Sequence, residues 1–421
     1  MRKFKIAAVI ACVSLCFAAL FSVACFASDV KLADIEGHWA KEYIEYGVEK
    51  GYINGYTDNT FKPNKTVTRA EFSKMINSAL GISGVTASEF IDVEDEDWFS
   101  NDVKRALYAG YIKGYDEDNT FRPNIPVSRQ EAAVIFSRIV LPVTQKASLD
   151  SFKDKADIAD WAKDAIATIA FKGYMNGDQN GNVLPKGQLT RAEAAKLISE
   201  LIKNENVVNG VQEIKKSQTV SQTIFTDGLV IAAQDDAEIL LEDCRVLGNI
   251  EVKSGTVILS LGNTTADVIT NNCTGELTLM ADKNSAVNQL IVHQPMYASG
   301  DDAFAKVMLE GKDLQSGTVE LEGEFELVEV GASAVLKAEE IENLNVTGKK
   351  TTLLVQSGKI ENLVVDKNAA DSAISLTQKV TVQNVTNNAT VSYTGMGVIE
   401  NAYNAVEGIS YETLPKKQTG K

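Results

Sequence analysis

The segment GYINGYTDNTFKPNKTVTRAEF, residues 51–72, decides the fold of the N-terminal part of the chain. Similar segments begin at Gly110 and Gly173, and each ends in a Ser/Thr-Arg-x-Glu motif. A Trp precedes the first Gly by 12 residues in all three copies, and 14 or 15 residues separate the second Gly from the Arg. A motif repeated at such constant spacing indicates one structural unit used three times.

Each copy predicts a helix, a loop and a second helix. In the first copy, apolar residues recur at helical spacing from Trp39 to Val48, and Gly51 is a typical helix-ending residue. A loop rich in Gly, Asn, Asp and Pro follows. Thr68 and Glu71 then form a capping box, the usual start of a helix. Units of about 60 residues bury too little apolar surface alone, so the three should share a core.

An arginine follows the capping residue in every copy: Arg69, Arg129 and Arg191. A cation in the first helical turn opposes the helix dipole at a cost of about 0.3–1 kcal/mol, so local structure does not explain it. Free amides at a helix start, together with a guanidinium, form a site for a carboxylate or a phosphate. The alternative is that each Arg pairs with an acid of a neighbouring repeat and only organises the shared core.

The three copies resemble the S-layer homology (SLH) family. The resemblance rests on the elements Asp-x4-Trp-Ala, Gly-Tyr-x2-Gly, Phe-x-Pro and Thr-Arg-Ala-Glu, and it covers about residues 29–205. It implies an all-α pseudo-trimer with repeats at residues 29–86, 87–147 and 148–205. Repeat two reads Ser-Arg-Gln-Glu, and repeat three replaces the Phe-x-Pro turn with Val183-Leu184-Pro185.

The resemblance also implies a ligand, the secondary cell-wall polymer. This peptidoglycan-linked glycan often carries a pyruvate ketal, whose carboxylate would suit an Arg. The implied groove residues are the Arg, Asp, Trp and second Gly of each repeat: Arg69, Arg129, Arg191, Asp34, Asp92, Asp154, Trp39, Trp98, Trp161, Gly55, Gly114 and Gly177. For the Trp positions, a place in the core of the first helix is favoured over stacking on a sugar.

The first 27 residues have the pattern of a signal peptide. A short basic stretch, residues 1–5, precedes an uncharged apolar stretch that ends with small residues at Cys25 and Ala27. We expect cleavage after Ala27 and no membrane span thereafter; an uncleaved membrane anchor is the alternative.

The net charge of the chain limits the kinds of partner that it can bind. The chain has a formal net charge of −16, and loss of Arg2, Lys3 and Lys5 with the leader would lower it to −19. Such a protein is repelled by nucleic acid and by anionic lipid, so neither is expected as a partner. Beyond the leader only Cys244 and Cys273 remain, so a disulfide framework is not expected; one bridge and two buried thiols both stay open.

The hydrophobic period changes after residue 205. Residues 206–221 are polar and are expected to form a linker. From residue 222 to residue 421, short β-branched runs predict strands, and apolar positions recur about every 20 residues: Ile250, Val268, Leu290, Leu309, Leu327, Leu344, Leu363 and Val385. Asn stands just before several of the aliphatic positions: Asn249, Asn343, Asn362 and Asn384. This pattern favours a β-solenoid, with a β-sandwich as the alternative.

No cofactor, metal or catalytic group is expected from the sequence. His38 and His293 lie in different parts of the chain, which excludes a His-based zinc site or relay. The pairs Asp235-Asp236 and Asp301-Asp302 could serve a polysaccharide-degrading solenoid, but they lack neighbouring catalytic partners. We therefore expect a secreted, wall-anchored surface protein, open to self-assembly in a surface layer, with a wall-tethered glycan-degrading enzyme as the alternative.

Overall fold

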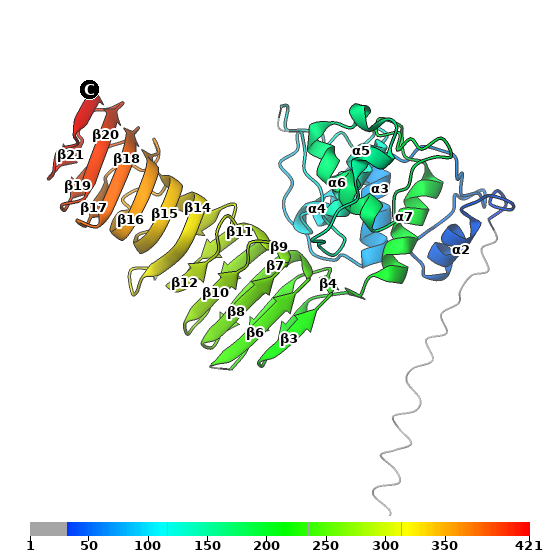
Figure 1. The fold of residues 1–421 in the computed structure, drawn as a ribbon, viewed down its shortest axis with the longest axis horizontal. Helices are drawn as coiled ribbons and strands as arrows, with labels where there is room; N and C mark the ends of the chain where they lie inside the picture. The colour runs from blue at the N-terminus through cyan, green and yellow to red at the C-terminus, as the bar shows by residue number, and fades with distance from the viewer. Residues whose placement is uncertain (1–31, 116, 235, 313) are drawn as a thin grey trace, which may run out of the picture.

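The computed structural model describes residues 32–115, 117–234, 236–312 and 314–421, and it has two lobes (Figure 1). The expected signal peptide lies outside the described residues. The first lobe is helical: α2 (Lys41–Glu49), α3 (Arg69–Leu80), α4 (Ser100–Tyr108), α5 (Arg129–Ser137), η1 (Leu149–Ser151), η2 (Lys155–Asp157), α6 (Asp160–Phe171) and α7 (Arg191–Asn204). Within the described part of the chain, no helix combines the length and apolar character needed to cross a bilayer.

The second lobe consists of short strands. They are β1 (Val207–Val208), β2 (Gln212–Ile214), β3 (Gln218–Ser221), β4 (Ile224–Phe225), β5 (Leu229–Ala232), β6 (Ala237–Glu242), β7 (Arg245–Ser254), β8 (Val257–Gly262), β9 (Thr265–Asn271), β10 (Leu277–Ala281), β11 (Ala286–Val292), β12 (Met296–Ser299), β13 (Val307–Leu309), β14 (Val319–Val330), β15 (Ala334–Val346), β16 (Thr352–Val365), β17 (Ser372–Leu376), β18 (Val380–Asn387), β19 (Val391–Thr394), β20 (Val398–Asn404), β21 (Ser410–Tyr411) and β22 (Lys417–Gly420). They stack away from the helical lobe, and the C-terminus lies at the far end (Figure 1).

The three helical repeats close around a pseudo-threefold centre. The residue before each capping residue donates its amide to the equivalent residue of another repeat: Val67 to Leu189 at 3.0 Å, Leu189 to Val127 at 2.9 Å, and Val127 to Val67 at 3.1 Å. All three side chains are fully buried. This ring of backbone hydrogen bonds confirms the shared core that the small size of one repeat predicts.

The second helix of each repeat starts as the sequence predicts. In α3, Thr68 Oγ1 accepts from the Glu71 amide at 3.2 Å, while Glu71 Oε2 accepts from the Thr68 amide at 2.9 Å. The same reciprocal box is present at α5 and α7. Each box fixes where the helix begins, and with it the position of the arginine that follows.

The strands form a β-solenoid of about 11 turns, as predicted. All pairings between named strands are parallel, and strands two apart in the chain pair, as in β6–β8–β10–β12 and β7–β9–β11–β13. The aliphatic side chains of successive turns fill one continuous core inside the solenoid. The alternative, a β-sandwich, would require antiparallel neighbours and is wrong.

A ladder of asparagines runs along the half of the solenoid that is farther from the helical lobe. Asn343, Asn362, Asn384 and Asn401 are in register, and the side-chain amide of each of the last three donates to the preceding Asn at 3.2 Å. The predicted stacked position is thus present, although Asn249 pairs with Val268 outside this ladder.

The expected linker is instead part of the solenoid. Strands β1, β2 and β3 lie within residues 206–221 and pair in parallel with β4, β5 and β6. Polarity misled the prediction, because only Ile214 of these first strands is buried while the backbone still bonds to the next turn. Cys244 and Cys273 are buried free thiols, so no disulfide joins the turns.

The two lobes are docked on each other by buried polar contacts. Asp227 of the solenoid accepts from the Ser83 amide at 2.9 Å and from the Gly84 amide at 3.1 Å, both in the helical lobe. Arg245 donates through Nε and Nη2 to the carbonyls of Val140 and Ser137, each at 3.1 Å, just beyond and at the end of α5. The solenoid therefore has a defined orientation on the repeats.

Candidate functional site

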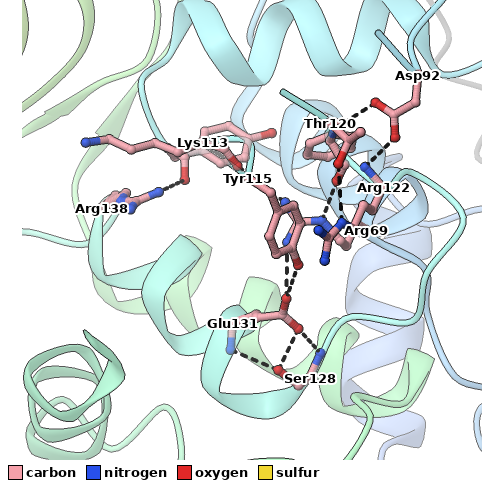
Figure 2. A network of polar contacts seen from close by, with 11 residues as sticks. Arg69, Asp92, Lys113, Tyr115, Thr120, Arg122, Ser128, Glu131 and Arg138 are labelled. Carbon is pink, nitrogen blue, oxygen red and sulfur yellow. Dashed lines mark hydrogen bonds and ion pairs between the residues drawn. The ribbon is translucent and has the colours of Figure 1, made fainter. Parts of the chain in front are cut away.

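The predicted aspartates hold the loop of their own repeat. Asp92 accepts from the amides of Phe121 and Arg122, both at 2.7 Å, and Arg122 has a φ of 57° (Figure 2). Asp34 and Asp154 make the same pair of bonds in repeats one and three. Both carboxylate oxygens of each Asp are thus occupied by backbone donors that stabilise a left-handed turn. The three aspartates therefore hold the loops of their repeats in place.

The helix starts do not offer the free amides that the sequence suggests. The amide of Arg69 donates to the Ile125 carbonyl and that of Ala70 to the Pro123 carbonyl, both at 3.0 Å. The next amide, of Glu71, belongs to the capping box. Repeats two and three make equivalent bonds, so these helix starts bind the loop of the following repeat, cyclically around the trimer. An anion would therefore have to be held by side chains.

Arg69 is a buried bridge from repeat one into repeat two. Its Nε donates to the Phe121 carbonyl at 2.8 Å, and its Nη1 lies 3.6 Å from Glu131 Oε1. The guanidinium lies 5.1 Å from the centre of the Tyr115 ring, and Tyr115 itself donates to Glu131 at 2.6 Å (Figure 2). Only 7% of the Arg69 side chain is exposed, so these groups largely cover its guanidinium.

The environment of Glu131 favours its charged form. Burial alone would raise the pKa of this carboxyl, but hydrogen bonds from Ser128 and Tyr115, together with the charge of Arg69, outweigh burial and lower the pKa below its ordinary value. Glu131 therefore stays ionised and keeps the Arg69 pair intact at neutral pH.

Arg191 is covered in the same way by repeat one. Its Nε donates to the Phe61 carbonyl at 2.8 Å, and its guanidinium lies 4.9 Å from the centre of the Tyr56 ring. The residue is 8% exposed. Two of the three arginines are thus covered by a tyrosine at the equivalent loop position, Tyr56 or Tyr115.

The groove beside Arg129 is open. The equivalent of Tyr56 and Tyr115 in repeat three is Asp178, whose carboxylate accepts from the amides of Asn180 and Asn182. With no ring over Arg129, a groove of about 480 Å³ lies at this position. Its lining comes from all three repeats, with Trp39 from repeat one, Arg129 from repeat two, and Gly177 and Lys196 from repeat three.

Arg129 retains donors on the wall of this groove. Its Nε donates to the Val183 carbonyl at 2.8 Å, and its Nη1 pairs with Glu193. Its Nη2 reaches only the Asn176 carbonyl, at 3.5 Å, which is a weak contact. A ligand carboxylate could replace that contact with a stronger, charge-assisted one.

The tryptophans lie on the surface. Trp39, Trp98 and Trp161 are 57%, 55% and 58% exposed, so the core position weighed for them is wrong. Trp39 lines the open groove, and Trp98 lies near Lys74, whose Nζ is 5.3 Å from a Trp98 ring centre. Flat, exposed indole faces at the rim of a groove suit stacking on sugars.

The second glycines permit close packing beneath the loop. A Cβ on Gly114 would lie 2.2 Å from the Phe90 ring, and one on Gly55 would lie 2.4 Å from Leu32. Gly177 has more space, since the nearest atom to such a Cβ would be 3.4 Å away, and it lines the open groove. The sequence reasoning missed Tyr56, Tyr115 and Lys196, although an alignment of the three repeats would have shown Tyr, Tyr and Asp at one position.

Asp301 and Asp302 line different grooves of the solenoid. Asp301 lines a groove of about 540 Å³ with Glu322, Glu324, Glu339 and Glu340, whereas Asp302 lines a neighbouring one of about 220 Å³. Asp235 lies outside the described residues. No cluster of His, Cys, Asp or Glu suited to a metal ion occurs among the residues that the structure describes.

The helical lobe matches a known family. Residues 31–73, 89–133 and 151–195 match the family model of the S-layer homology domain. The chain is 40% identical over 184 residues to an amylopullulanase of Thermoanaerobacterium thermosulfurigenes, a match over 42% of this chain and 10% of that protein. It is 28% identical to the surface-layer 125 kDa protein of Lysinibacillus sphaericus, over 45% of this chain and 16% of that one.

A third similar protein is the cellulosome-anchoring protein of Acetivibrio thermocellus, 30% identical over 37% of this chain and 35% of that protein. This chain thus spans a minor part of the length of the proteins it matches. The chain contains three SLH repeats, and these together with its S-layer and cell-surface relatives identify a cell-surface protein.

Proposed function

We propose that the three SLH repeats anchor this protein non-covalently to the cell wall by binding an anionic, pyruvylated secondary polymer, and that the solenoid is displayed outward as a stalk or interaction module. The groove that joins Trp39, Arg129 and Lys196 carries the proposal. It offers an aromatic face for a sugar ring and two cations for a carboxylate, and its lining comes from all three repeats.

The distribution of charge supports this assignment. The chain is strongly acidic, so a polyanion gains nothing from its surface as a whole. Attraction has to be local, and Arg129 and Lys196 supply it at the open groove. The carboxylate of Glu193 faces the same groove and repels anions that are not held in a fixed position. Only a carboxylate that its sugar places beside Arg129 would therefore gain binding energy from this cation.

The binding test uses the full chain and purified wall sacculi. We expect sedimentation with intact sacculi, loss of sedimentation after the polymer is stripped, and weaker binding to polymer from which pyruvate has been removed. Trp39→Ala should weaken binding several-fold because a stacking face is lost. Leu414→Ala, which removes an exposed apolar side chain of the solenoid, is the matched control. Equal binding to stripped and intact sacculi would overturn the proposal.

A second candidate function is glycan cleavage by the solenoid. The observation in its favour is the acidic groove around Asp301, because glycosidases act through paired carboxylates. Similar proteins include enzymes, but these share only their SLH regions with this chain. Release of reducing sugar from wall glycan by the full chain, abolished in Asp301→Asn, would support cleavage; absence of release favours anchoring alone.

A further inference from the structure

A second pocket lies at the junction of the two lobes, apart from the groove beside Arg129. It has a volume of about 140 Å³, and its lining includes Lys113 and Arg138 of the helical lobe and Arg245 and Asp267 of the solenoid. In Figure 2, the side chains of Lys113 and Arg138 extend away from the Arg69 and Glu131 cluster. They therefore belong to a different face of repeat two.

Positive charge at this junction exceeds negative charge. Three cationic side chains and one carboxylate line the pocket, although the chain as a whole is acidic. Among the residues that the structure describes, none of these four groups forms an ion pair within 4.0 Å. Asp267 instead accepts from Asn288 Nδ2 at 2.7 Å.

Burial makes this arrangement costly. It lowers the pKa of Arg245 to about 10, which leaves the guanidinium charged at neutral pH. Burial also lowers the pKa of Arg138, as does the charge of Arg69. Arg138 Nη1 and the Arg245 nitrogens Nε and Nη2 donate to backbone carbonyls, which carry no compensating charge. The charge of Asp267 offsets part of this cost for Arg138, and the charge of Glu205 offsets part of it for Arg245. The pKa of each arginine nevertheless stays lowered, so a further anion would stabilise the junction.

The pocket wall also carries a buried hydroxyl group. The hydroxyl oxygen of Thr265, a residue of the pocket wall, is buried and has no hydrogen-bond partner among the described residues. The volume is enough for a small oxyanion.

We propose that this junction pocket binds one small oxyanion, of the phosphate or carboxylate class, between Lys113, Arg138 and Arg245. The anion would be held by groups from both lobes, so it would stabilise the docking of the solenoid on repeat two. The site does not depend on the wall-binding groove, because none of the three cations lines that groove.

The test titrates the full chain with sodium phosphate by calorimetry at constant ionic strength, with chloride as the balancing anion. We expect one saturable site per chain and a rise in melting temperature with phosphate. Lys113→Gln and Arg138→Gln should each weaken phosphate binding at least about tenfold, since a charge-assisted contact is lost. Lys367→Gln, an exposed lysine of a distant turn, is the charge-matched control and should bind like the parent chain.

No saturable phosphate binding by a folded parent chain would overturn the proposal, as would equal affinity in all three variants. The groove variant Arg129→Ala separates this site from wall anchoring, because it should lose sacculus binding and keep phosphate binding. A final arm identifies the source of the anion. If phosphate competes with sacculi and Arg138→Gln weakens sacculus binding, the anion is a polymer substituent; if neither occurs while phosphate still binds, it is a free anion.

Discussion

At the residue scale, three arginines that share one motif differ in their surroundings. Arg69 and Arg191 are covered by Tyr115 and Tyr56, whereas Arg129 faces an open groove. A single residue of the loop, Asp178 in place of a tyrosine, makes the difference. One sequence motif therefore serves two purposes here, holding repeats together and exposing a cation.

We expect Arg69→Ala to destabilise the fold and Arg129→Ala to weaken wall binding. Arg69→Ala removes buried, charge-assisted hydrogen bonds and should lower the free energy of unfolding by about 1.5–3 kcal/mol. Arg129→Ala should cost about the same in binding free energy with a smaller change in stability. Denaturant unfolding and sacculus binding measure the two effects, and Lys216→Ala, an exposed lysine of the solenoid, is the control. The reverse pattern would contradict the assignment.

The lowered pKa of Glu131 predicts how the stability of the fold changes in acid. Its pKa in the folded protein is lower than the ordinary 4.5, so protonation favours the unfolded chain. Its contribution to stability is therefore fully present above about pH 4.5 and is lost as the pH falls through the lower, folded-state pKa. Glu131→Gln should be less stable than the parent at pH 7, and the difference should narrow below pH 4.5. A difference that stays constant over this range would contradict the lowered pKa.

Residue types revealed the site only in part. The motif marked Arg, Asp, Trp and Gly as one set, yet each acts differently. Asp92 saturates two backbone amides, Gly114 makes room for Phe90, and Trp39 lies at the rim. Such roles follow from the direction of a side chain in three dimensions, which spacing along the chain does not define.

At the scale of elements, the loop between the two helices of a repeat depends on its aspartate. Asp92→Ala should release the amides of Phe121 and Arg122 and lower the free energy of unfolding by about 1.5–3 kcal/mol, because bonds to a charged group are lost. Thermal unfolding of the full chain measures this loss. Glu96→Ala, an exposed acid nearby, should melt like the parent. Equal melting of both variants would show that the turn forms without its clamp.

The period of the solenoid was predictable, and its register was not. The sequence placed Val268 and Leu327 among the apolar positions that recur about every 20 residues, but the pairing joins Ile250, Ile269, Leu290, Val307 and Val328 into one column. Both predicted residues are only partly buried, one position away. Bulges shift the strands by a residue, as between Val246 and Asn249, and a spacing of about 20 residues tolerates such shifts.

At the scale of the molecule, the two lobes should unfold together. Asp227 is 2% exposed and accepts three hydrogen bonds from Ser83 and Gly84, across the junction. Asp227→Ala should loosen the docking and separate the calorimetric transition into two, one for each lobe. Glu407→Ala, a surface acid of a distant turn, should keep the parental profile. A single unchanged transition in Asp227→Ala would show that the junction contributes little to cooperativity.

The change of hydrophobic period after residue 205 predicted two different parts of the chain but not their contact. The bonds of Arg245 to α5 join residues more than 100 positions apart in the sequence, and both partners are backbone carbonyls that any sequence would supply. Similarly, Ile224 and Leu247 belong to the solenoid strands by sequence but pack into the helical core. No periodic pattern marks such residues.

The connections between the lobes have a mechanical consequence. The solenoid is joined to repeat three by the chain that leaves α7, to repeat two by Arg245 at the end of α5, and to repeat one by Asp227, which accepts from Ser83 and Gly84. A tensile load on the outer end would therefore enter the ring at all three repeats instead of at one. A single tether can swivel, whereas three attachments resist torque, so the solenoid would act as a rigid lever with its fulcrum at the ring of repeats.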